Sequence, residues 1–121
     1  MSLILVVDDD PAMRELMAKR VEAGGYCAVL AEGGYQGLEV FVRFGPDLVV
    51  TDMSMPAGEG DELIAAIRLR APEAKILAIS GGLMAIGEQS GPEFVPAAVD
   101  AVLSKPFRIR EFCAAVDRLL P

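Results

Sequence analysis

Five short apolar runs alternate with longer segments of mixed polarity, and this alternation constrains the fold more than any other feature of the sequence. The runs are rich in Val, Leu and Ile and occupy residues 3–7, 27–31, 48–51, 76–79 and 101–103. Continuous apolar runs of this length are typical of parallel strands that are buried on both faces of a sheet. Their alternation with helical segments predicts a doubly wound α/β fold, in which helices cover both faces of one parallel sheet.

The segments between the runs carry the start and stop signals of helices. Asp10 can cap a helix that has Pro11 at its first position, and Gly24 is placed to end that helix. Later helical segments are expected to stop at Gly45 and before Pro72. The final helix should turn an apolar stripe toward the core, and the residues of this stripe are Ile109, Phe112, Cys113, Val116 and Leu120.

Residues 81–99 depart from this pattern because they are rich in glycine and proline. No long helix can continue through such a set of helix-breaking residues. We expect a loop followed by a short helix near residues 92–98, so the fourth helix should be irregular or shortened.

Composition restricts the possible classes of function. The chain has 121 residues, which suits a single domain over residues 1–121. Its formal net charge of −7 argues against direct binding of nucleic acid, which requires clustered Lys and Arg. The chain contains no histidine, which excludes sites with a histidine base and most zinc sites. Any chemistry must therefore use carboxylates, hydroxyls and lysines.

The sequence carries no sign of export or membrane insertion. No apolar stretch reaches the roughly 18–20 residues that a membrane helix needs, and no signal peptide is visible. Cys27 and Cys113 lie far apart in apolar surroundings, which favours two reduced thiols in the core. We therefore expect a cytoplasmic protein without membrane contact.

Polar residues follow four of the five runs at the point where each run ends: Asp8-Asp9-Asp10, Asp52, Ser80-Gly81 and Lys105-Pro106. The carboxyl ends of parallel strands meet at one edge of a sheet, about 4.8 Å apart between neighbours. Each group also has a purely structural interpretation. The aspartates after the first run and Ser80 could cap helices, whereas Asp52 and Lys105-Pro106 could form turns. Their occurrence at the same end of successive strands favours a common site.

Three carboxylates in one pocket repel one another unless a cation neutralises their charge. A hard divalent ion with oxygen ligands suits such a site, and Mg²⁺ is the usual ion in phosphate chemistry. A carboxylate beside Mg²⁺ can act as a nucleophile toward a phosphoryl group, whose oxygens then need positive or donor partners. The metal, the Lys105 ammonium, and the Ser80 hydroxyl with the Gly81 N–H can supply them.

Taken together, the motifs resemble those of the response-regulator receiver domains of two-component signal transduction systems. The resemblance extends over essentially the whole chain. It is carried by Val6-Val7-Asp8-Asp9, by residues 48–56 together with Gly60, by Ile79-Ser80-Gly81 and by Lys105-Pro106-Phe107. It implies the (βα)5 flavodoxin-like fold with the strand order 2-1-3-4-5.

The resemblance also implies a role for each site residue. Asp52 matches the phosphoacceptor, and Asp8 and Asp9 match the acidic pair that positions Mg²⁺. Ser54 matches a position that offers its backbone carbonyl to the metal. The other two roles are the switch residue, matched by Ser80, and a lysine followed by a commonly cis peptide, matched by Lys105. The implied phosphoryl donor is a histidine kinase or a histidine phosphotransfer protein, and the implied recipient of the signal is an unidentified partner or effector domain.

Two departures from the family pattern concern the way in which the signal leaves the site. Val102 stands where the family has its switch aromatic, so a swinging ring is absent. The second departure is that residues 81–99 are rich in glycine and proline, which disfavours a regular fourth helix. We therefore expect these residues, instead of a ring, to respond to phosphorylation by a change between disorder and order.

Two other functions compete with the phosphoacceptor interpretation. A phosphohydrolase with an aspartyl nucleophile needs a second acid near that residue, and Ser54 cannot act as one. A pseudo-receiver that binds partners without phosphorylation is the main alternative, although the complete set of acidic residues with Ser80 and Lys105 argues against it.

The charged outer face expected for the last helix predicts that the unphosphorylated chain is mainly a monomer.

Overall fold

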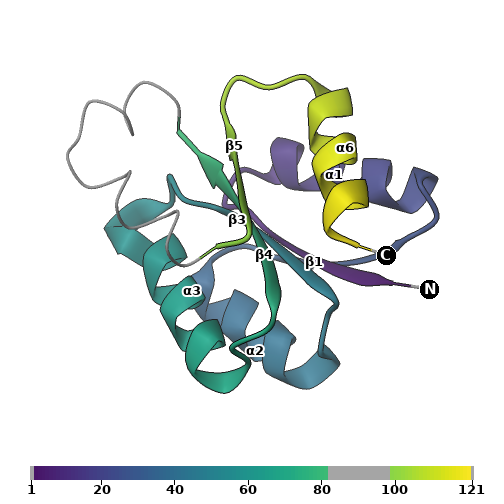
Figure 1. Ribbon diagram of the computed structural model, residues 1–121. Coiled ribbons are helices and arrows are strands. Elements are labelled where there is room, and N and C mark those ends of the chain that lie inside the picture. The colour runs from purple at the N-terminus through teal and green to yellow at the C-terminus, as the bar shows by residue number, and fades with distance from the viewer. Residues whose placement is uncertain (1, 82–98, 121) are drawn as a thin grey trace.

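The computed structural model describes residues 2–81 and 99–120 and shows a five-stranded parallel sheet (Figure 1). The strands are β1 (Leu3–Val7), β2 (Cys27–Ala31), β3 (Leu48–Asp52), β4 (Lys75–Ser80) and β5 (Ala101–Ser104). They are arranged in the order β2-β1-β3-β4-β5. All five apolar runs thus form strands, and the predicted order is confirmed.

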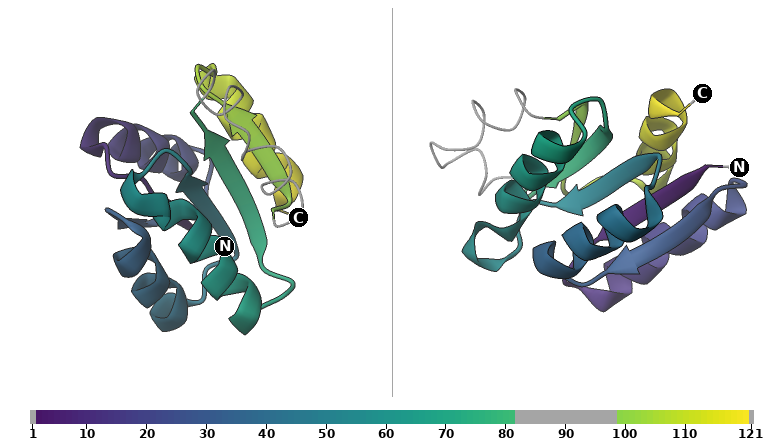
Figure 2. Two further views of the ribbon diagram at one scale, coloured as in Figure 1. Left: turned by 90° about the vertical axis from the view of Figure 1, so that its left-hand side faces the viewer. Right: turned by 90° about the horizontal axis from the view of Figure 1, so that it is seen from below.

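Two layers of helices cover the sheet, one on each face (Figure 2). On one face, α1 (Pro11–Ala23) and α6 (Ile109–Leu119) pack against Ile4, Val6 and Val50 of the sheet. On the other face, α2 (Gly34–Phe44) and α3 (Glu59–Arg70) pack against Leu5, Val7 and Val49. A short 3₁₀ turn over Pro56–Gly58 directly precedes α3. Successive residues of each central strand therefore contribute to opposite cores, which is why these strands are apolar throughout.

The prediction that every strand is buried on both faces is wrong for the two edge strands. Cys27 and Leu30 of β2 are exposed, as is Val102 of β5. Each edge strand has a neighbour on one side only, so the helical layers cover it incompletely. For the same reason the prediction of two core thiols fails at Cys27, whereas Cys113 is partly buried against the core.

The ends of the helices follow the predicted signals. The Asp10 carboxylate accepts a hydrogen bond of 3.1 Å from the Ala12 N–H at the start of α1. Gly45 ends α2 in the left-handed conformation with φ of 57°, which favours glycine. The short helix expected near residues 92–98, and the order–disorder change expected over residues 81–99, concern a segment that lies almost entirely outside the described residues.

The apolar stripe of α6 is absorbed by the core, as predicted. Phe112, Val116 and Leu120 are buried, whereas the charged residues of the helix are exposed. Little apolar surface on this helix is left for a second copy of the chain. We expect sedimentation velocity of the unphosphorylated chain at micromolar concentration to show mainly monomer, and a tight dimer would contradict this.

A side chain that precedes β5 ties three parts of the fold together. The Asp100 carboxylate accepts hydrogen bonds of 2.7 Å from the Ile76 N–H and 3.1 Å from Arg68 Nη2. Removing the carboxylate in Asp100→Ala leaves the Ile76 N–H without its acceptor, so we expect a loss of about 1–3 kcal/mol in the free energy of unfolding. Asp100→Asn keeps an acceptor oxygen and should lose less in the same urea titration. Equal losses in the two variants would show that this hydrogen bond contributes nothing.

Candidate functional site

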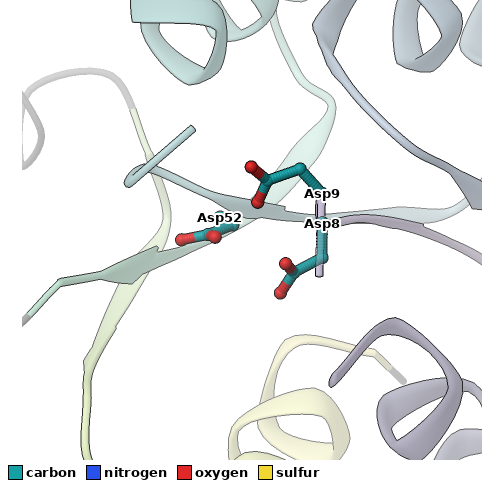
Figure 3. A group of neighbouring side chains, drawn as sticks. All are labelled: Asp8, Asp9 and Asp52. Carbon is teal, nitrogen blue, oxygen red and sulfur yellow. The ribbon is translucent and has the colours of Figure 1, made fainter. Parts of the chain in front are cut away.

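Three carboxylates meet at the carboxyl ends of β1 and β3. Asp8 and Asp9 directly follow β1, and Asp52 is the last residue of the neighbouring strand β3. One oxygen from each of the three carboxylates lies within 4.8 Å of the others. Figure 3 shows the three side chains gathered around one space at this edge of the sheet. The convergence predicted from the sequence is therefore present.

Asp8 carries a carboxylate that the protein alone leaves half satisfied. The residue is completely buried, and its Oδ1 accepts a hydrogen bond of 2.9 Å from the Asp10 N–H. Its Oδ2 is buried and has no hydrogen-bond partner among the described residues. Burial raises the pKa of Asp8 to about 6, with the charge of Asp52 adding to the rise and the Asp10 N–H opposing it.

Asp52 is held by one donor on each of its oxygens. Its side chain is buried, and Oδ1 accepts a hydrogen bond of 3.0 Å from the Ser54 N–H. Its Oδ2 lies 3.5 Å from the Nζ of Lys105. Lys105 directly follows β5, and only β4 lies between β5 and the strand β3 that carries Asp52. The peptide between Lys105 and Pro106 is cis. The structure thus brings Lys105 to Asp52, as predicted.

Ser80 and Gly81 lie beside this cluster at the end of β4. Ile79 pairs with Asp52 in the register between β3 and β4, so Ser80 lies one position beyond the phosphoacceptor candidate. A Cβ atom on Gly81 would lie 2.6 Å from the Ser54 Oγ, closer than real contacts allow. A larger residue at this position would therefore force the Ser54 side chain to rotate, which shows how close the end of β4 lies to the loop that follows Asp52.

A family model described as the response regulator receiver domain matches residues 4–117. The chain belongs to this family. Response regulator MprA of Mycobacterium leprae (strain TN) is 33% identical to this receiver domain over 117 residues, which cover 97% of the chain and 50% of that relative. The receiver domain thus spans about half the length of the curated relatives it matches.

Solved structures place the same fold over almost the whole receiver domain. TrrA of Thermotoga maritima, in complex with Mg²⁺–BeF, is 32% identical with a TM-score of 0.86, covering 99% of this chain and 100% of TrrA. TrrA in complex with the histidine kinase ThkA gives 32% and 0.84, with both chains fully covered. A receiver domain protein from Methanospirillum hungatei JF-1 gives 26% and 0.86, covering 98% of this chain and 94% of that one.

Two contacts near the site of this receiver domain were not expected from the sequence. Arg14 donates a hydrogen bond of 2.7 Å from Nη1 to the backbone carbonyl of Asp8. The Glu59 carboxylate accepts one of 2.9 Å from the Gly34 N–H, at the start of a helix that has no side-chain cap of its own. Both contacts join different elements that come together only in the folded chain, so no local sequence pattern predicts them.

Among the described residues, no helix is both long and apolar enough to cross a membrane.

Proposed function

We propose that this receiver domain accepts a phosphoryl group on Asp52 in a reaction that requires Mg²⁺. The observation that carries the proposal is the surrounding of the Asp52 carboxylate. It is buried, lies within one cluster with two other carboxylates, and has a lysine ammonium 3.5 Å away on its second oxygen. A buried nucleophile with a cation site on one side and an ammonium on the other suits phosphoryl transfer.

The acidic cluster fits a magnesium ion on chemical grounds. All three side chains offer carboxylate oxygens, the ligands that Mg²⁺ prefers, and the buried Asp8 Oδ2 lacks any partner within the described part of the chain. We assign metal binding to Asp8, Asp9 and Asp52, with the backbone carbonyl of Ser54 as a further ligand. When bound, Mg²⁺ neutralises the cluster and stabilises the charge on the transferred group.

In the proposed reaction, a carboxylate oxygen of Asp52 attacks the phosphorus atom of the donor. The new O–P bond forms as the bond from phosphorus to the donor atom breaks, and the electron pair leaves with the donor. Lys105 would then hold one phosphoryl oxygen through its ammonium group, while the Ser80 hydroxyl and the Gly81 N–H hold another. The product is an aspartyl phosphate, so the domain is a phosphoacceptor that assists its own modification.

The proposed donor is a histidine kinase or a histidine phosphotransfer protein, and it acts in trans because the chain has no histidine of its own. TrrA, 32% identical, has been crystallised with the histidine kinase ThkA, which supports a donor of this class. We also propose that the domain works in the cytoplasm and that its phosphorylated form passes the signal to an output partner or effector domain.

The test is incubation with acetyl phosphate, a small donor that needs no partner protein. Intact-mass spectrometry should show one added phosphoryl group when Mg²⁺ is present and none when EDTA replaces it. A chain that stays unmodified under both conditions would favour the pseudo-receiver interpretation and overturn the proposal.

A further inference from the structure

Arg14 connects helix α1 to the loop that carries the acidic pair. It lies in the first turns of the helix and is partly buried. Its side chain reaches back to the end of β1, where Nη1 donates a hydrogen bond of 2.7 Å to the backbone carbonyl of Asp8. This contact belongs neither to the helix nor to the sheet, so it needs another explanation.

The carbonyl in question lies just beyond the regular sheet. The register between β1 and β2 ends with the pair Val7 and Ala31. The Asp8 N–H still donates to the Ala31 carbonyl at 3.2 Å, but β2 ends there. The guanidinium of Arg14 thus continues the hydrogen bonding at the point where the strand partner stops.

Holding this carbonyl also restricts where the next residue can lie. The peptide unit is planar, so the Asp8 carbonyl, the Asp9 N–H and the Asp9 Cα share one plane. Asp8 has a second anchor, because its Oδ1 accepts from the Asp10 N–H. Asp9 has none: its side chain is exposed, and no hydrogen bond to its carboxylate is present within the described ranges.

We propose that Arg14 is a positioning residue for the metal site: by holding the Asp8–Asp9 peptide, it keeps the Asp9 carboxylate facing Asp8 and Asp52. This inference rests on the proposed binding of Mg²⁺ at the acidic cluster. Groups that orient metal ligands without touching the metal commonly change its affinity by about 10- to 100-fold. Arg14 has the geometry for such a role, because its only described side-chain hydrogen bond ends on the ligand-bearing loop.

A purely electrostatic role for Arg14 predicts the opposite result. A positive charge near a cation site repels the cation, so removing it would strengthen Mg²⁺ binding. A positioning role predicts that removing the donor weakens binding. The sign of the change in affinity therefore separates the two.

The experiment is a Mg²⁺ titration followed by amide NMR shifts, on wild type, Arg14→Met, Arg14→Lys and Arg20→Met. Methionine keeps an unbranched stem but no donor, and lysine restores a donor with its charge. Arg20 is exposed on the same helix and serves as the matched control. We expect Arg14→Met to raise the Kd for Mg²⁺ by about tenfold or more, Arg14→Lys to recover most of the affinity, and Arg20→Met to match wild type.

Urea unfolding of each metal-free variant shows whether the change is local. Unchanged unfolding of Arg14→Met together with weaker Mg²⁺ binding supports the proposal. Unchanged or tighter Mg²⁺ binding by Arg14→Met overturns it, as does a weakening matched by general loss of stability. If wild type itself does not bind Mg²⁺, the proposed function fails; if wild type binds and Arg14→Met binds equally well, only the role of Arg14 fails.

Discussion

Replacing Asp52 by Asn should abolish Mg²⁺-dependent phosphorylation by acetyl phosphate. An amide has no anionic oxygen to attack phosphorus, so the nucleophile is lost. The shape of the side chain is kept, and the amide oxygen can still accept the hydrogen bond that Asp52 Oδ1 receives from the Ser54 N–H at 3.0 Å. We therefore expect the phosphorylated species in the intact-mass spectrum to fall to background while the fold persists.

Asp10→Asn is the matched control for this experiment. Asp10 lies at the same edge of the sheet and caps α1, a role that asparagine fills equally well. It is not one of the three clustered carboxylates, so its neutralisation should leave phosphorylation largely intact. Labelling of Asp52→Asn at the wild-type level would mean that another group is the acceptor, and the assignment of Asp52 would be wrong.

The sequence predicts the fold and the location of the site because both depend on a local pattern. Each buried strand is a continuous apolar run, and the first polar residue after it marks the end of the strand. Asp8 and Asp52 occupy such positions on neighbouring strands. In a parallel sheet all carboxyl ends lie at one edge, so the positions of the strands alone predict that these residues lie together.

Features that depend on the neighbours of an element could not be read in the same way. The apolar run of β2 resembles those of the central strands, yet Cys27 is exposed because this strand lies at the edge. Likewise, Arg14 looks like an ordinary exposed residue of an amphipathic helix. Its hydrogen bond to the Asp8 carbonyl requires both the helix and the loop to be in place, and a long flexible side chain has many other positions in an unfolded chain.

The second large effect concerns the stability of the metal-free protein. The pKa of Asp8 rises from 3.8 to about 6, chiefly because the carboxyl is buried. The folded protein therefore holds this proton more tightly than the unfolded chain does. The contribution of Asp8 to the free energy of unfolding is fully favourable below about pH 4 and is lost as the pH rises through about 6. Above that pH, the buried charge of Asp8 should cost about 2–3 kcal/mol.

Asp8→Asn removes the charge and keeps an oxygen that can accept from the Asp10 N–H, so it should stabilise the metal-free chain at pH 7 by about 2–3 kcal/mol. Urea titrations in EDTA at several pH values will show this gain and its loss toward pH 4. Asp9→Asn is the control: Asp9 is exposed, so its gain should be smaller. Added Mg²⁺ should stabilise wild type but not Asp8→Asn, because binding to the folded state alone raises its stability. A metal-free Asp8→Asn variant that is less stable than wild type at pH 7 would show that the Asp8 charge is compensated within the protein, and that the cluster does not need a cation.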